Sequence, residues 1–288
     1  MAPHAQAAAA LLPGTSRPNV AVLVSGAMRT LPECQGSVKR YIIDANPSMD
    51  FSFYIYATVD NETQVSEAQR LASTAYPIVK SVLVLSGNQT SQAVRQALPT
   101  LESLPPGSGT AKGKAGNIAQ MLMGLSIAER LCGLPSPPVV RQSIPPPRRN
   151  LSDSDNYRVD HDLVLRLRPD LCFCRPLILR KLLGKNAVHV PWMSSGMAFD
   201  QLAAGPPGLM ARYSAAFETT LPKEVALQHE LYPEKLLALH LESERLPLRK
   251  LRGLHASLNR GAGVFDDPFG KLKVDFAQHR FPTHTCER

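Results

Sequence analysis

The segment Asp-Leu-Val-Leu-Arg-Leu-Arg-Pro-Asp-Leu, at residues 162–171, constrains the fold of this chain more than any other. Its run of leucine and valine contains no turn residue, which is typical of a strand buried on both faces of a parallel or mixed sheet. Pro169 cannot donate a hydrogen bond to a neighbouring strand, so we expect the strand to cover 162–168 and to end there. The sequence therefore predicts an α/β fold with this strand at its centre.

Charged side chains cluster where this strand ends. Arg166, Arg168 and Asp170 are two residues apart, so at least the two arginines share one side of an extended chain. Ligands of open α/β sheets bind beyond the carboxyl ends of the strands, where guanidinium groups beside a carboxylate suit a phosphate and its divalent cation. The alternative is an internal Arg–Asp ion pair that only closes the strand. The segment by itself leaves both interpretations open.

The N-terminal part of the chain alternates strands and helices, which implies a mostly parallel sheet with right-handed crossovers. A buried strand at 19–25 is expected to be central like the strand at 162–168. The other strands are predicted at 51–57, 79–85, 187–191 and 246–251. The helices are predicted at 31–43, 64–74, 92–98, 117–132, 177–183, 208–218 and 232–244, so that the C-terminal part is mainly helical.

The domain organisation follows from composition. Residues 1–18 are interpreted as a disordered leader, 19–260 as a single α/β domain, and 261–288 as an irregular tail. Mobile loops are expected near 104–116 and 134–156, which are rich in Pro, Gly, Ser and basic residues. No run of apolar residues reaches the roughly 18 that a membrane span needs.

The chain is basic, with a formal net charge of +8. The excess is spread over both halves of the sequence, whereas nucleic-acid-binding proteins usually concentrate it on one face or tail. We interpret the charge as a general attraction for anionic ligands and expect no nucleic-acid partner.

The cysteines and the glycosylation sequons say less about the fold and the cellular compartment than the strand at 162–168 says about the fold. Five cysteines are too few and too scattered for a disulfide scaffold, and the close pair Cys172 and Cys174 is interpreted as two small apolar side chains on one side of an extended segment. Three sequons, at Asn61, Asn88 and Asn150, lie in predicted loops and favour a secretory lumen slightly.

Two further segments are candidates for ligand binding. Ser25 and Gly26 form a turn between the first strand and first helix, where free backbone amides and Arg29 suit a diphosphate or nucleotide, although an ordinary strand–helix turn explains them equally well. Asp200 lies just beyond an apolar run, where it is either a helix N-cap or a carboxylate that reaches an acceptor hydroxyl.

Other motifs are set aside. The Gly- and Lys-rich stretch at 107–115 lacks the spacing and the hydroxyl residue of a phosphate-binding loop. The triplets Asp153-Ser-Asp155 and Asp160-His-Asp162 do not follow a strand, so we interpret them as solvated loop carboxylates.

Three segments together resemble a glycosyltransferase-like family of the GT-A type, which includes bacterial lipopolysaccharide-synthesis proteins and uncharacterised relatives in algae and plants. They are VAVLVSGAMRTLPEC, HDLVLRLRPDLCF and FDQLAAGPPGLMARY. The resemblance implies a GT-A-like (Rossmann-related) fold, a nucleotide-sugar donor, a glycan or other hydroxyl acceptor, and Mn²⁺ or Mg²⁺ on the diphosphate. It assigns donor binding to Ser25, Gly26, Arg29, Arg166, Arg168 and Asp170, and the metal to Asp170.

The chain departs from the better-known GT-A pattern at one point. The strand ends in Arg168-Pro169-Asp170 and so offers one carboxylate in place of a full Asp-x-Asp triplet. Arg166 and Arg168 would then neutralise the leaving diphosphate, and Asp200 is our candidate for the base near the acceptor. The alternative is a non-catalytic nucleotide-sugar- or glycan-binding domain that kept the fold without full metal ligation.

Overall fold

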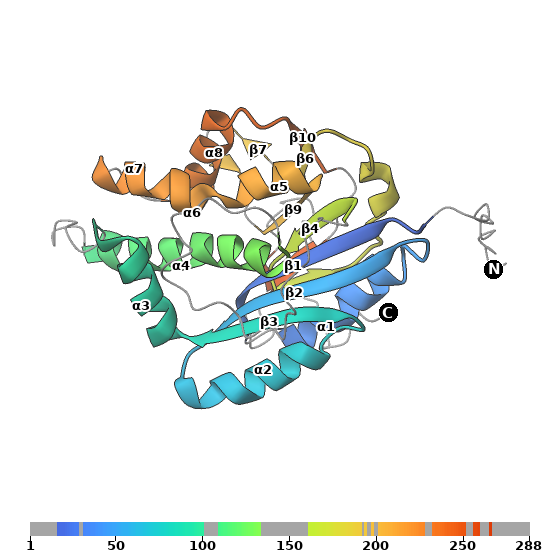
Figure 1. The fold of residues 1–288 in the computed structure, drawn as a ribbon, viewed down its shortest axis with the longest axis horizontal. Helices are drawn as coiled ribbons and strands as arrows, with labels where there is room; N and C mark the ends of the chain where they lie inside the picture. The colour runs from blue at the N-terminus through green and yellow to red at the C-terminus, as the bar shows by residue number, and fades with distance from the viewer. Residues whose placement is uncertain are drawn as a thin grey trace, which may run out of the picture.

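The structure is a computed structural model. It describes residues 16–28, 31–100, 109–133, 161–191, 193–194, 197–198, 201–227, 232–251, 256–259 and 265–266. Within these ranges the chain forms an α/β fold with a mixed, mostly parallel sheet and helices on both of its faces (Figure 1). The α/β class predicted from the sequence is confirmed.

The main sheet has seven strands, in the order β10-β6-β9-β4-β1-β2-β3. Their bounds are β1 Asn19–Ala27, β2 Asp50–Val59, β3 Val79–Ser86, β4 Leu163–Leu167, β6 Val188–Val190, β9 Leu202–Gly205 and β10 Leu248–Lys250. Strands β1 and β4 are central neighbours, and every residue of β4 is buried. The expectation that the two most apolar runs form the middle of the sheet is confirmed, because such runs need cover on both faces.

One strand of the main sheet was not predicted. β9 lies antiparallel between β4 and β6, whereas the other pairings of this sheet are parallel. Its sequence, Leu-Ala-Ala-Gly, is short and has neither β-branched residues nor alternation, so local sequence carries no strand signal there. Burial on both sides between β4 and β6 stabilises it as a strand instead.

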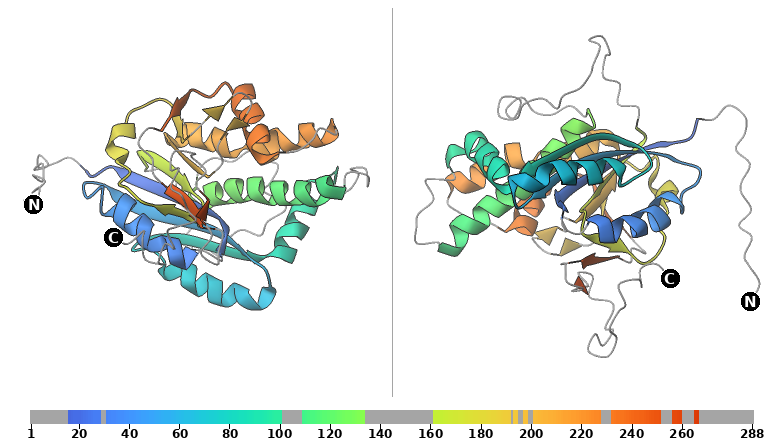
Figure 2. Two further views of the ribbon diagram at one scale, coloured as in Figure 1. Left: turned by 180° about the vertical axis from the view of Figure 1, so that it is seen from behind. Right: turned by 90° about the horizontal axis from the view of Figure 1, so that it is seen from below.

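The helices cover the two faces of the sheet separately (Figures 1 and 2). Alternation along β1 shows the division, since Leu23 faces the core beneath α4 and Val22 faces the core beneath α1 and α2. Helix α4 runs across one face, and α5, α6 and α8 gather near β9 and β6 (Figure 1). The bounds are α1 Leu31–Val38, η2 Lys39–Ile43, η3 Glu62–Gln64, α2 Val65–Thr74, α3 Gly87–Ala97, α4 Gly109–Leu131, η6 Leu179–Leu182, α5 Pro207–Ser214, α6 Ala216–Thr219, α7 Leu221–Ala226 and α8 Pro233–Ser243.

Several helices differ from the sequence-based prediction. Helix α7 was not predicted, the helix predicted at 208–218 is divided into α5 and α6, and the one predicted at 177–183 is only the short η6. Helix α4 begins at Gly109, so the part of the predicted loop 104–116 from 109 onward is helical. Helix α3 begins at Gly87 and not at 92, because a capping box stabilises its first turn. The Gln89 N–H donates a hydrogen bond to the Ser86 hydroxyl, and the Ser86 N–H donates one to the Gln89 side-chain oxygen. The predicted loop at 134–156 lies outside the described residues, as does most of the leader and tail.

Smaller sheets complete the fold. β5 (Leu171–Phe173), β11 (Ala256–Asn259) and β12 (Phe265–Asp266) form one, and β7 (Met193–Ser194) and β8 (Met197–Ala198) form another. Among the described residues, no helix has the length and apolar character needed to cross a membrane.

Candidate functional site

The central feature of the candidate site is the meeting of two strand ends. β1 and β4 pair in parallel, with Val20 opposite Leu163 and Val24 opposite Leu167. The carboxyl ends of β1 and β4 therefore lie at the same edge of the sheet. This is the arrangement that the sequence predicted for a ligand site at the carboxyl ends of the strands. The turn predicted at Ser25 and Gly26 is wrong, because both residues pair with β2 as part of β1, which continues to Ala27.

Contact between the two segments is close at Gly26. A Cβ atom built on Gly26 would lie 2.8 Å from Cδ of Pro169, and Gly26 has a φ of +149°. L-residues with a side chain rarely adopt this φ. Both the backbone conformation and the proximity of Pro169 thus require glycine here.

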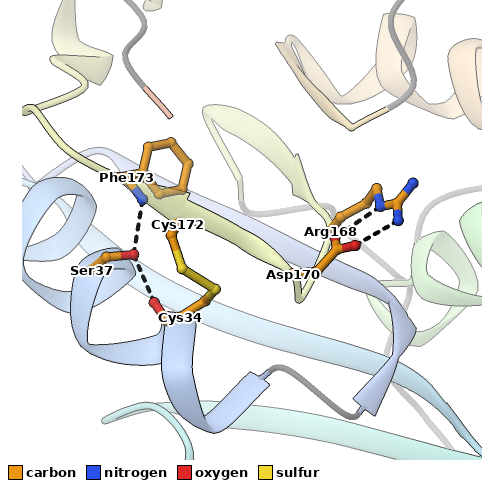
Figure 3. The surroundings of a disulfide bond; sticks show 6 residues. All are labelled: Cys34, Ser37, Arg168, Asp170, Cys172 and Phe173. Atoms are coloured by element: carbon orange, nitrogen blue, oxygen red, sulfur yellow. Dashed lines mark hydrogen bonds and ion pairs between the residues drawn. A yellow bond between two sulfur atoms is a disulfide. The ribbon is translucent and has the colours of Figure 1, made fainter. Parts of the chain in front are cut away.

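Arg168 and Asp170 form a two-pronged ion pair beyond the end of β4 (Figure 3). Nε of Arg168 donates to one carboxylate oxygen at 2.9 Å, and Nη2 donates to the other at 2.6 Å. The side chains are 23% and 10% exposed. This is the internal Arg–Asp ion pair that the alternative interpretation of residues 162–171 predicted. The Arg168 guanidinium nevertheless stays partly open to solvent.

Arg166 differs from Arg168 in its surroundings. It lies within β4, opposite Leu23 of β1 and Ala203 of β9, and is only 1% exposed. Leu23 and Ala203 belong to the core beneath α4, so the Arg166 side chain is on that face of the sheet. The structure encloses this guanidinium, and only Arg168 of the two arginines is open to solvent.

Two buried polar side chains near the strand ends each have an oxygen atom without a hydrogen-bond partner among the described residues. They are Ser25, whose Oγ is unpaired, and Gln201, whose Oε1 is unpaired; the residues are 3% and 6% exposed. Unsatisfied buried groups are uncommon and call for a specific explanation. The Gln201 carbonyl also accepts a hydrogen bond from the Arg168 N–H at 3.1 Å, which extends the β4–β9 pairing past the strand. Sequence reasoning missed Gln201, although it directly follows Asp200 in the segment that carried the family resemblance.

The wall of the site toward α4 is tightly packed. A Cβ on Gly124 of α4 would lie 2.9 Å from the Tyr56 ring and 3.9 Å from Cβ of Ser25. Burial raises the pKa of Tyr56 to about 12, despite its contact with the Thr90 hydroxyl, so the phenol stays neutral. Ser25 therefore lies against an apolar, uncharged wall.

A disulfide joins the two segments that lead away from the candidate site (Figure 3). It links Cys34 of α1, the helix that follows β1, to Cys172 of β5, the strand that follows Asp170. Beside it, the Ser37 hydroxyl donates to the Cys34 carbonyl at 2.8 Å and accepts from the Phe173 N–H at 2.9 Å. The interpretation of Cys172 and Cys174 as equivalent apolar side chains is wrong, because Cys172 is buried in the disulfide whereas Cys174 is exposed.

Most of the other residues singled out by sequence are not described by the structure. Arg29 and Asp200 are outside the described residues, and so are Asp153, Asp155 and Asp160. Asp162 lies at the amino end of β4, where its carboxylate accepts the Asn19 N–H at 2.8 Å.

The described residues do not form a cation site. No group of three or more His, Cys, Asp or Glu side chains with metal-binding geometry occurs among them. Both oxygens of Asp170 are held by Arg168. In this arrangement Arg168 engages the carboxylate to which the resemblance assigns Mn²⁺ or Mg²⁺.

A cavity of about 660 Å³ lies at the opposite edge of the sheet. Its lining includes Asn19, Asp50, Lys80 and His161, near the amino ends of the parallel strands. It does not coincide with the meeting of β1 and β4. We base the candidate site on the carboxyl edge, because parallel sheets bind ligands there and because the unpaired buried groups Ser25 and Gln201 lie there.

No protein-family model matches the chain, and a search of curated proteins found no match.

Proposed function

We propose that this protein is a GT-A-type, glycosyltransferase-like protein that transfers a sugar from a nucleotide-sugar donor to a glycan or other hydroxyl acceptor. The observation that carries the proposal is the parallel pairing of β1 with β4, which brings Ser25 and Gly26, near the end of β1, to the segment that follows β4, where Gly26 packs against Pro169. A donor diphosphate at this edge would be near the end of β1 and the partly exposed Arg168 guanidinium.

Sugar transfer requires neutralisation of the charge on the leaving diphosphate and a base that deprotonates the acceptor hydroxyl. As the bond between the sugar and the diphosphate breaks, negative charge grows on the leaving group, and the Arg168 guanidinium can stabilise it. Ser25 and Gln201 have unpaired polar atoms that can bond to donor hydroxyl or phosphate groups once the site opens. Asp200 is the proposed base for the acceptor hydroxyl. No step in this scheme depends on a cation.

A second candidate function is supported by the Arg168–Asp170 pair. Because both oxygens of Asp170 are engaged, the carboxylate is not available to a metal or a sugar in this arrangement. A non-catalytic domain that binds nucleotide sugars or glycans needs no such carboxylate.

Thermal denaturation with a panel of nucleotide sugars and free nucleoside diphosphates, with and without Mn²⁺, tests the proposal. A ligand that binds only the folded state at 100 times its Kd stabilises it by roughly 2.7 kcal/mol, which raises Tm measurably. Release of free nucleoside diphosphate in the presence of a hydroxyl acceptor then distinguishes the enzyme from the binding domain. A panel that leaves Tm unchanged throughout would contradict both functions.

A further inference from the structure

The sequon Asn61-Glu62-Thr63 lies on the surface immediately after β2. All three residues are exposed. The Asn61 backbone is extended, with φ −122° and ψ 149°, and the helical turn η3 begins only after it. Asn61 precedes η3 and Thr63 lies within it, and because both residues are exposed, the acceptor amide and the required hydroxyl are accessible to an enzyme in solution.

The sequon at Asn88 is built differently. It forms the first turn of α3, which corrects the prediction that it lies in a loop. Asn88 is exposed, but Thr90 is 0% exposed, and its hydroxyl donates to the Ser86 carbonyl at 2.9 Å. When α3 is folded, the Thr90 hydroxyl of this sequon is therefore not accessible to a glycosylating enzyme. The third sequon, at Asn150, lies outside the described residues.

The disulfide between Cys34 and Cys172 is a second, independent observation. Structural disulfides form and persist in oxidising compartments such as the endoplasmic reticulum lumen and are rare in the cytosol. N-linked glycosylation takes place in that same lumen. The chain thus combines a buried disulfide with an exposed acceptor sequence that the same compartment would modify.

We propose that Asn61 is an N-glycan acceptor. The Asn61 side-chain nitrogen forms a bond to the anomeric carbon of a lipid-linked oligosaccharide, the bond from that carbon to the lipid pyrophosphate breaks, and the amide loses one proton. A glycan attached here projects from the surface and leaves the packing of β2 and α2 unchanged. The proposal does not depend on the function of the site at β1 and β4.

Translation of the full chain behind a cleavable signal sequence, in the presence of endoplasmic reticulum microsomes, tests this assignment. The variants are Asn61→Gln, Thr63→Ala and, as the matched control, Asn88→Gln. Enzymatic removal of N-glycans converts each occupied Asn to Asp, so peptide mass spectrometry gives the occupancy of each sequon. A non-reducing gel shows whether Cys34 and Cys172 have paired, which reports entry into the lumen.

We expect Asn61 to be occupied in the wild type and in Asn88→Gln. The Asn61→Gln and Thr63→Ala variants should lose that glycan but still form the disulfide. The glycosylated and enzymatically deglycosylated chains should melt at the same temperature. A chain that forms the disulfide while Asn61 stays unmodified overturns the proposal, and so does a chain that forms neither.

Discussion

Gly26 and Pro169 are packed so closely that a Cβ on Gly26 would lie 2.8 Å from Cδ of Pro169. The contact joins the end of β1 to the end of β4 at the point where the candidate site forms. The two strand ends can approach this closely only because residue 26 is a glycine, which has a hydrogen atom in place of a Cβ.

Gly26→Ala should therefore destabilise the protein. The new methyl group has to displace Pro169, and alanine has to adopt a φ of +149°; together these effects cost about 1–3 kcal/mol. Denaturant unfolding followed by circular dichroism measures the change. Gly208→Ala in α5 is the matched control, because a Cβ there meets nothing within 4 Å, and it should show no loss of stability.

The Cys34–Cys172 disulfide should contribute strongly to stability. It closes a chain segment with a sequence separation of 138 residues, and such long loops gain the most from cross-linking the unfolded state. We expect the double variant Cys34→Ser/Cys172→Ser to lose about 2–4 kcal/mol of unfolding free energy. Cys174→Ser, at an exposed cysteine outside the disulfide, is the control and should lose far less stability than the double variant. Equal stability of the wild type before and after full reduction would argue against a structural role.

The sequence was sufficient to predict those strands whose own residues favour an extended chain. The runs at β1, β2, β3 and β4 are long, apolar and rich in β-branched residues or leucine, so their sequences specify strands on their own. β9 could not be found this way, because a Leu-Ala-Ala-Gly segment becomes a strand only through its neighbours.

The candidate site could be predicted in part. That two buried strands would present their carboxyl ends together follows from parallel topology, and the structure confirms this for β1 and β4. The partner of Cys34 could not be identified, since cysteines distant in sequence meet only after α1 and β5 have packed. Whether Arg29 and Asp200 reach the same edge stays a prediction.

The buried carboxyl group of Glu129 should make stability depend on pH. Burial, and then the nearby charge of Glu218, raise the pKa of Glu129 well above its ordinary 4.5. The folded state thus binds a proton that the unfolded state releases, so the free energy of unfolding falls as pH rises from about 4.5 toward the folded-state pKa. Glu129→Gln keeps the neutral shape and should flatten this decline in denaturant titrations across that range.

Glu242→Gln is the control for this experiment, since Glu242 is exposed on α8. Its pH profile should run parallel to that of the wild type. A Glu129→Gln profile with the wild-type slope would show that the buried carboxyl group does not cause the decline.

Asp170→Asn distinguishes the roles assigned to the Arg168–Asp170 pair. The substitution keeps the side-chain shape but removes the charge that holds Arg168 at 2.6 and 2.9 Å. Loss of a largely buried charged hydrogen bond should cost about 1–3 kcal/mol of stability. Glu67→Gln breaks an ion pair of the same two-pronged kind on the exposed surface of α2, and it should change stability little.

The same variant should separate sugar transfer from diphosphate binding. If Asp170 holds the donor sugar, Asp170→Asn abolishes transfer, measured as release of nucleoside diphosphate with a hydroxyl acceptor. Binding of free nucleoside diphosphate without metal should persist or strengthen, because the Asp170 carboxylate no longer competes with phosphate for the Arg168 guanidinium. Arg168→Gln should instead lose that binding. Normal transfer by Asp170→Asn would show that the carboxylate only closes the strand, and unchanged diphosphate binding by Arg168→Gln would place the donor elsewhere.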